Sequence, residues 1–166
     1  ESAENQLMMC GSIGDVLGGN AFGGAGVSFQ SAYNLTDTPH NFLQVKLDFI
    51  ALDGWDNADE AQVYLDDELM WSATPRIMSD GRDYLVHGEG RRNFCGRSQV
   101  DRVHHVVFSI NHTSSDARLR ISTTLDDPPT DESWAIDNVH IALVMNMSEL
   151  SIGGTCQSLC STSTTN

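Results

Sequence analysis

The sequence predicts an all-β protein, an antiparallel β-sandwich or jelly roll of about seven to nine strands. Three observations lead to this prediction. Apolar and polar residues alternate with a period of two in one segment after another. No stretch of about ten residues has the i, i+3, i+4 apolar spacing of an amphipathic helix. Short polar turns separate the alternating segments, as is typical of sandwiches and barrels.

The alternating segments give the expected positions of the strands, in chain order 27–29, 43–49, 63–65, 69–71, 84–86, 106–110, 119–123 and 139–143. The clearest is 43–49, in which the apolar residues from Leu43 to Phe49 alternate with polar ones. The segments 63–65 and 69–71 flank Asp66-Asp67 and therefore indicate a hairpin.

The length of 166 residues is that of one domain with its own core. We expect the jelly roll to cover residues 16–145, with an N-terminal segment over 1–15 and a Cys-containing, Ser/Thr-rich segment over 146–166. Residues Leu7 to Met9 have the composition of a strand that adds to another subunit. The segment 18–26, GGNAFGGAG, is dense in glycine and flexible by composition.

The charge of the chain excludes several classes of partner. Asp and Glu number 23 against 9 Lys and Arg, which gives a net charge of −14. Such a surface repels phosphate backbones and anionic membranes, so we expect no nucleic-acid binding. No apolar run approaches the roughly 20 residues that span a bilayer, so no membrane insertion is expected either.

Four cysteines are consistent with two disulfides: Cys10, Cys95, Cys156 and Cys160. Four thiols allow three pairings, and the sequence does not choose among them. A zinc site and free thiols remain as alternatives. Only Cys156 and Cys160 have a short spacing, and no second close pair supports zinc.

Three N-x-S/T sequons, at Asn34, Asn111 and Asn146, fall where a strand pattern ends. A bulky glycan is tolerated at such positions. Together with the cysteines, the sequons predict an extracellular glycoprotein, secreted or at a cell surface.

Two stretches, 52–71 and 125–141, crowd carboxylates and amides beside a tryptophan. Calcium takes six to eight oxygen ligands, and such side chains supply them. The first loop offers Asp53, Asp56, Asn57, Asp59 and Glu60, and the closing strand adds Asp137 and Asn138. Our preferred calcium ligands are Asp53, Asp56 and Asp137, followed by Asn57 and Asn138. Turn capping and surface solubility are the alternative role of these residues.

Five runs together resemble one extracellular, lectin-like β-jelly-roll module: VLGGNAFGGAGVSF, VKLDFIALDGWDN, VYLDDELMW, Cys95-Gly96 and LDDPPTDESWAIDNVHI. Such modules occur in secreted and surface proteins of protists and algae, and the resemblance covers residues 16–143. It implies a jelly-roll fold, a structural calcium, and a role in sugar binding, adhesion or assembly. Asp67 replaces the usual turn glycine and must accept a positive φ or a different turn, and Ala135 replaces the glycine after Trp134.

Catalytic motifs such as G-x-S-x-G and H-E-x-x-H are absent, so we expect no enzymatic activity. Our preferred hypothesis is a structural subunit that assembles with identical copies into a glycosylated filament or coat. The alternative is a calcium-dependent carbohydrate-binding adhesion module. In that case an exposed tryptophan among Trp55, Trp71 and Trp134 would stack on sugar rings. Otherwise these residues are core or loop anchors.

Overall fold

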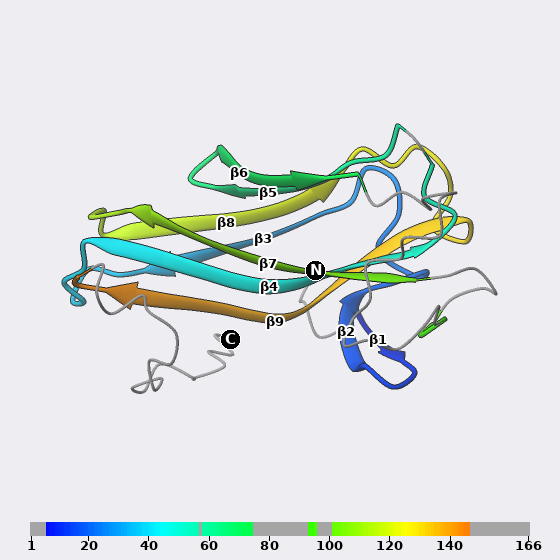
Figure 1. Cartoon of the computed structure of the whole chain (residues 1–166), viewed down its shortest axis with the longest axis horizontal. Coiled ribbons are helices and arrows are strands. Elements are labelled where there is room, and N and C mark those ends of the chain that lie inside the picture. The colour runs from blue at the N-terminus through cyan, green and yellow to red at the C-terminus, as the bar shows by residue number, and fades with distance from the viewer. Residues whose placement is uncertain (1–5, 57, 75–92, 96–100, 147–166) are drawn as a thin grey trace.

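Two antiparallel sheets, of five and four strands, face each other in the computed structural model of the chain (Figure 1). The structure describes residues 6–56, 58–74, 93–95 and 101–146. It confirms the predicted all-β, antiparallel sandwich, with nine strands among these residues. In the same part of the chain, no helix is long and apolar enough to cross a bilayer.

The five-stranded sheet has the order β1 (Leu7–Cys10), β2 (Gly14–Gly18), β9 (Glu132–Val144), β4 (Phe42–Asp53) and β7 (Arg102–Asn111). The four-stranded sheet has the order β3 (Ser28–Asn34), β8 (Asp116–Thr123), β5 (Ala61–Leu65) and β6 (Glu68–Ala73). Every predicted strand among the described residues coincides with or overlaps one of these. The predicted segment 84–86 lies outside the described residues.

The main core lies between the sheets and follows from the alternation of β4. Leu43, Val45, Leu47 and Phe49 are all buried in it, as the period of two predicts. Phe49 stacks on Trp134 of β9 with ring centroids 5.5 Å apart. The aromatic pair joins two neighbouring strands at the centre of the sandwich.

A β-bulge in β9 changes which of its residues face the core. Lys46 is opposite His140 and Asp48 is opposite Asp137, so β9 has one extra residue between these pairs. Asn138, within the bulge, has a φ of 51°. Even-numbered residues such as Ile136 face the core before the bulge, and odd-numbered ones face it afterwards.

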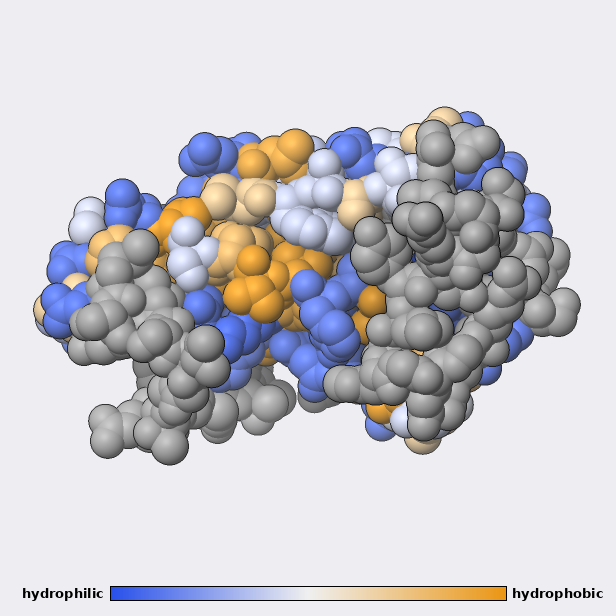
Figure 2. Space-filling model, viewed as in Figure 1, coloured by the Kyte–Doolittle hydropathy of each residue, from blue (hydrophilic) through white to orange (hydrophobic). Residues whose placement is uncertain are grey.

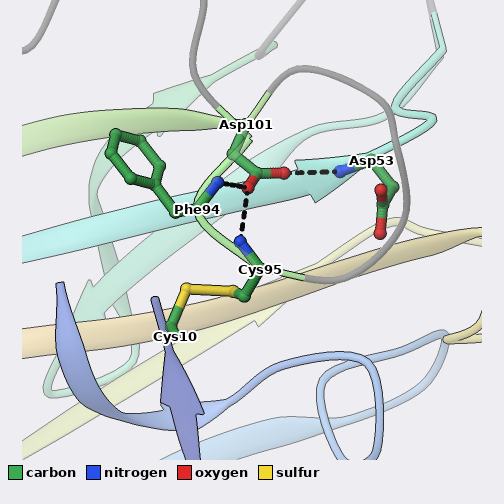
Figure 3. Close-up of a disulfide and its surroundings, with 5 residues drawn as sticks. All are labelled: Cys10, Asp53, Phe94, Cys95 and Asp101. Carbon is green, nitrogen blue, oxygen red and sulfur yellow. Dashed lines mark hydrogen bonds between the residues drawn. A yellow bond between two sulfur atoms is a disulfide. The ribbon is translucent and has the colours of Figure 1, made fainter. Parts of the chain in front are cut away.

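A smaller apolar cluster covers the outer face of the five-stranded sheet near the end of β4, where the disulfide Cys10–Cys95 lies. The Asp101 carboxylate accepts hydrogen bonds from the backbone N–H groups of Phe94, at 2.6 Å, and Cys95, at 3.0 Å. Its other oxygen accepts the N–H of Asp53 at 3.2 Å (Figure 3). Asp101 therefore holds the disulfide-bonded segment against the end of β4.

The N-terminal hairpin belongs to the domain's own sheet. Within the chain, β1 pairs with β2, and β2 pairs with β9. Among the described residues β1 is an edge strand, so the addition of Leu7 to Met9 to another subunit stays a prediction. The expected boundary at residue 16 falls inside β2. Val16 is buried and contributes to the smaller cluster, so the hairpin packs as part of the sandwich.

The two departures from the module pattern fit the fold. Asp66 and Asp67 both have positive φ, 51° and 66°, so the hairpin between β5 and β6 has the left-handed turn that such a connection needs. Ala135 lies within the ladder of β9, opposite Ile50, and is fully buried. The start of β9 is therefore regular, as expected from an alanine there.

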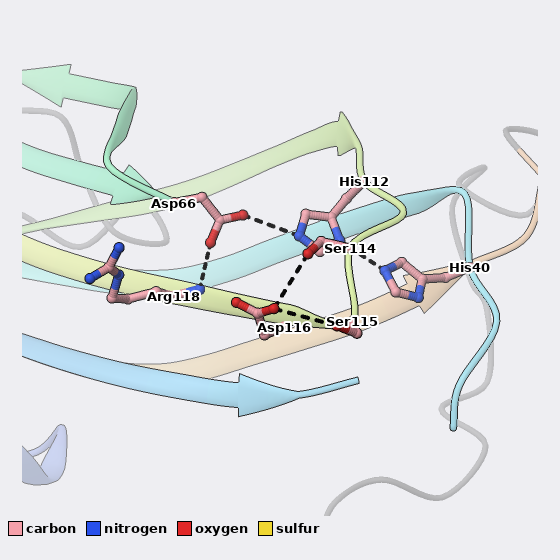
Figure 4. A network of polar contacts seen from close by, with 7 residues as sticks. All are labelled: His40, Asp66, His112, Ser114, Ser115, Asp116 and Arg118. Atoms are coloured by element: carbon pink, nitrogen blue, oxygen red, sulfur yellow. Dashed lines mark hydrogen bonds and ion pairs between the residues drawn. The ribbon is translucent and has the colours of Figure 1, made fainter. Parts of the chain in front are cut away.

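A buried pair of histidines lies at the end of the sandwich opposite the disulfide (Figure 4). His40 Nε2 lies 2.8 Å from His112 Nδ1, and His40 Nδ1 lies 2.7 Å from the carbonyl oxygen of Thr38. His112 Nε2 lies 3.1 Å from Asp66, whose other oxygen accepts the Arg118 N–H.

Replacing His112 with phenylalanine should cost about 1–3 kcal/mol of unfolding free energy. The ring volume is kept, but His40 Nε2 and one oxygen of Asp66 lose their partner. Urea unfolding monitored by circular dichroism measures the change. Ser114→Ala is the matched control, because the exposed Ser114 hydroxyl makes only a 3.5 Å contact with Asp116. Equal costs for the two variants would contradict this account of the network.

Candidate cation site

The loop after β4 and the loop before β9 meet at one end of the sandwich. Asp53 and Glu132 are register partners there, so the two loops leave the sheet side by side. The Trp55 indole N–H donates to the carbonyl oxygen of Ser133 at 2.8 Å. The Gly54 N–H donates to the carbonyl of Asp131 at 3.1 Å. These contacts fix the loops relative to each other.

Glu132 is the central carboxylate at this end. It is 3% exposed, and no described residue forms a hydrogen bond with its Oε2. Carboxylate oxygens of Asp56, Asp59 and Glu132 all lie within 4.8 Å of one another. Asp59 is 2% exposed and accepts the backbone N–H of Asp56, while Asp56 accepts the N–H of Ala58 at 2.7 Å. Backbone hydrogen bonds therefore hold the Asp56 and Asp59 carboxylates in place beside Glu132.

A second group of carboxylates shares Glu132. Oxygens of Asp126, Asp127 and Glu132 also lie within 4.8 Å of one another. Asp126 and Asp127 are exposed, so this group opens to solvent. The turn that follows them is closed by the Asp131 N–H, which donates to the carbonyl of Pro128 at 2.8 Å. The end of the sandwich thus gathers five carboxylates from two loops and the start of one strand.

Burial and the repulsion of neighbouring carboxylates disfavour the ionised forms of Glu132 and Asp59. Burial raises the pKa of Glu132 to about 7, and the charges of Asp59, Asp127 and Asp56 act in the same direction. Burial is also the largest cause of the raised pKa of Asp59. A divalent cation would replace the missing counter-charge, because it favours the ionised form of each ligand.

The calcium-free protein should lose stability as the pH rises from about 4.5 to about 7. The folded state holds the Glu132 proton more tightly than the unfolded state does. Protonation of Glu132 therefore stabilises the fold fully below the ordinary pKa of 4.5, and this stabilisation is lost as the pH rises through the folded-state pKa of about 7. Glu132→Gln should lack this fall and be more stable than the wild type at pH 8. Urea midpoints in metal-free buffer, compared between the two proteins at each pH, measure it. A difference that does not change with pH would contradict the prediction.

The structure separates the residues that the sequence proposed as ligands. Asp56 lies in the first group, and Asp53 is buried beside Asp101 at the end of β4. Asp137 and Asn138 lie at the bulge of β9, where the Asn138 amide donates to Asp48 at 2.8 Å. Asp137 lies five positions after Glu132 in β9, about 17 Å along an extended strand, so Glu132 is the residue of the closing strand that lies beside the loop. Asn57 lies outside the described residues.

Sequence reasoning missed Glu132, Asp126 and Asp127 as candidate ligands, and it placed Asp59 among the candidates without preferring it. All three missed residues belong to the stretch 125–141 that the sequence singled out. The available signal was the start of the strand before Trp134, since the first residue of a strand lies next to the loops.

The structure contains one disulfide among the described residues. Cys10 pairs with Cys95, whereas Cys156 and Cys160 lie outside the described residues.

The sequon asparagines Asn34, Asn111 and Asn146 are exposed. Asn34 is opposite Asp116 at the start of β8, Asn111 is opposite Phe42, and Asn146 follows the end of β9. All three lie at the end opposite the carboxylates.

The tryptophans are anchors of the fold. Trp55 and Trp134 are buried in the main core, and Trp71 is half-buried against it. Only the half-buried Trp71 therefore remains for the alternative that a tryptophan stacks on sugar rings, which stays a prediction.

The fold and the site define a β-sandwich domain with a preformed acidic end. No family model and no curated protein matches the sequence. Among solved structures the domain is similar to part of dimeric latent PorU from Porphyromonas gingivalis, at 13% identity and a TM-score of 0.51 over 74% of this chain. The match covers 11% of the PorU chain. A likeness at this identity shows the fold alone.

Proposed function

We propose that the chain is a non-enzymatic, extracellular structural subunit that assembles with identical copies, and that calcium stabilises its acidic end. The observation that carries the proposal is Glu132, a buried carboxylate with an unpartnered oxygen and two further carboxylates within one ion's reach. A buried, unpaired carboxylate is costly, so its presence at a loop end is best explained by an ion that compensates it.

The chemistry of the site favours calcium. All the candidate ligands are hard oxygen atoms of carboxylates, which suit calcium or magnesium rather than zinc or copper. Calcium accepts six to eight ligands in irregular arrangements, so water and loop carbonyls can complete the shell on the exposed side of Asp56. Magnesium demands a near-ideal octahedron, which two independent loops meet less readily.

Thermal unfolding with and without calcium tests the site. We expect calcium to raise the melting temperature of the wild type, with about 2.7 kcal/mol of stabilisation at a hundredfold excess over Kd. Glu132→Gln should abolish the rise. Glu68→Gln is the matched control, because Glu68 is an exposed carboxylate on β6. An unchanged melting temperature on chelation in the wild type would refute a stabilising calcium.

The disulfide and the sequons support an extracellular location. A disulfide persists in an oxidising compartment. The Thr36 hydroxyl donates to Asn34 Oδ1 at 2.7 Å, and both residues are exposed, so the first sequon is accessible to modification. Expression through a eukaryotic secretory pathway should give a mass that falls on enzymatic removal of N-glycans. An unchanged mass would remove the glycoprotein part of the proposal.

Exposed apolar side chains support self-assembly. On β1, an edge strand of the five-stranded sheet, Leu7 is 53% and Met9 is 66% exposed. Figure 2 shows further apolar residues gathered near the middle of one face, with hydrophilic residues around them. A net charge of −14 opposes association, and bound calcium would reduce it.

Sedimentation velocity of the full chain in calcium tests assembly. We expect species much larger than the monomer, and we expect Met9→Lys to shift them toward the monomer because it adds a charge to the edge of β1. Glu68→Lys, an exposed charge change on the other sheet, is the control. A strictly monomeric wild type at high concentration would exclude the structural-subunit proposal.

Calcium-dependent sugar binding is the competing proposal. It rests on the cation site, since Trp55 and Trp134 are buried in the core and Trp71 is half-buried against it. A glycan array with calcium, repeated with a chelator, separates the two proposals. Calcium-dependent binding to a sugar by a monomeric protein would favour the adhesion module.

A further inference from the structure

We infer that the acidic end holds two divalent cations and that the Glu132 carboxylate bridges them. The inference rests on the calcium site proposed above and adds the number of ions and the role of each loop. In it, Asp56 and Asp59 bind one ion, and Asp126 and Asp127 bind the other.

The distances between the carboxylates favour two ions over one. Calcium–oxygen distances are about 2.3–2.6 Å, so oxygens bound to one ion lie within roughly 5 Å of each other. Among the described residues, the carboxylates form two groups of this size, and only Glu132 belongs to both. One ion therefore does not reach all five carboxylates in this arrangement, whereas two ions do.

The binding capacity of the Glu132 carboxylate also suits two ions. A carboxylate has two oxygens with about four lone pairs, and it can bind one ion through each oxygen. The Glu132 Oε2 has no hydrogen-bond partner among the described residues. At 3% exposure, water does not compensate that oxygen freely. A buried oxygen between two acidic groups is placed to bind an ion.

Charge balance also favours two ions. The two groups together contain five carboxylates, which carry five negative charges when ionised. A single divalent cation leaves three of these charges uncompensated, and the repulsion persists at short range. Two divalent cations leave one. The ions of two-metal sites in proteins lie about 4 Å apart.

Native mass spectrometry and calorimetric titration of the oxidised full chain with calcium count the ions. We expect two ions in the wild type and one in Asp126→Asn/Asp127→Asn, whose changes are both at exposed positions and leave the buried group intact. Asp56→Asn should also bind one, and Glu68→Gln should bind two. Circular dichroism of each variant in chelator checks the fold.

The outcomes separate the two levels of the proposal. One ion in the wild type, or equal numbers in the wild type and the Asp126→Asn/Asp127→Asn variant, would overturn the bridged pair while leaving a single stabilising calcium. No bound ion in the wild type would overturn both. Because the double variant changes only exposed side chains, the test does not depend on whether Glu132→Gln folds.

Discussion

Replacing Trp134 with alanine is expected to lower the free energy of unfolding by about 3–5 kcal/mol. Trp134 is fully buried, and its ring contacts Phe49 and Phe29 with centroids at 5.5 Å and 4.8 Å. A smaller side chain would leave a cavity between the sheets. The backbone around it cannot close the cavity, because a Cβ on Gly18 or Gly23 would lie within 2.6 Å of the Trp134 carbonyl oxygen. The chain already approaches as closely as glycine allows.

Urea unfolding in calcium-containing buffer measures this effect, and Trp134→Phe is the informative comparison. The Trp134 indole N–H is buried without a hydrogen-bond partner among the described residues, so phenylalanine removes an unpaired donor together with part of the ring. We expect Trp134→Phe to cost clearly less than Trp134→Ala. Equal costs would mean that aromatic packing at this position contributes little.

Loss of the disulfide between Cys10 and Cys95 is expected to have a similarly large effect. The bond closes a loop with a sequence separation of 85, for which loop-closure entropy gives about 4.5 kcal/mol of stabilisation. Urea unfolding of Cys10→Ser/Cys95→Ser against the oxidised wild type measures the loss. Adding a reductant to the variant isolates any contribution of Cys156 and Cys160. A stability loss well under 1 kcal/mol would mean that the N-terminal hairpin is held by packing alone.

Much of the sandwich could be predicted because its strands have one face in a core. The alternation from Leu43 to Phe49 marks a strand whichever strands lie beside it, and the same holds for β7 and β8. β1 and β2 gave no such signal. They are short, and β2 contains two glycines, Gly14 and Gly18, so their strand conformation depends on pairing with β9 and on the disulfide.

The acidic groups of the candidate cation site could be predicted only in part, because their proximity depends on register. The sequence identified the loop that carries Asp56 and Asp59, and the stretch that carries Glu132. It chose Asp137 from that stretch, although the pairing of β4 with β9 places Glu132 opposite Asp53 and Asp137 opposite Asp48. Strand pairing over long sequence separations is a tertiary property, so local alternation does not reveal it.

The glycine-dense segment shows the same limitation. Its composition predicted flexibility, but backbone hydrogen bonds fix it to the start of β9. The Gly19 N–H donates to the Trp134 carbonyl at 2.8 Å, and the Trp134 N–H donates to the Gly23 carbonyl at 2.8 Å. Here the glycines permit close approach rather than movement.

The position of the disulfide also determines how the domain responds to force. Cys10 lies on one edge strand of the five-stranded sheet, and Cys95 precedes the opposite edge strand. Tension applied at the N-terminus therefore passes through the covalent bond from β1 to the segment beside β7. The chain between the two cysteines, with a sequence separation of 85, would otherwise extend to about 290 Å. In the oxidised protein the disulfide prevents this segment from extending under tension, and reduction would allow it to extend.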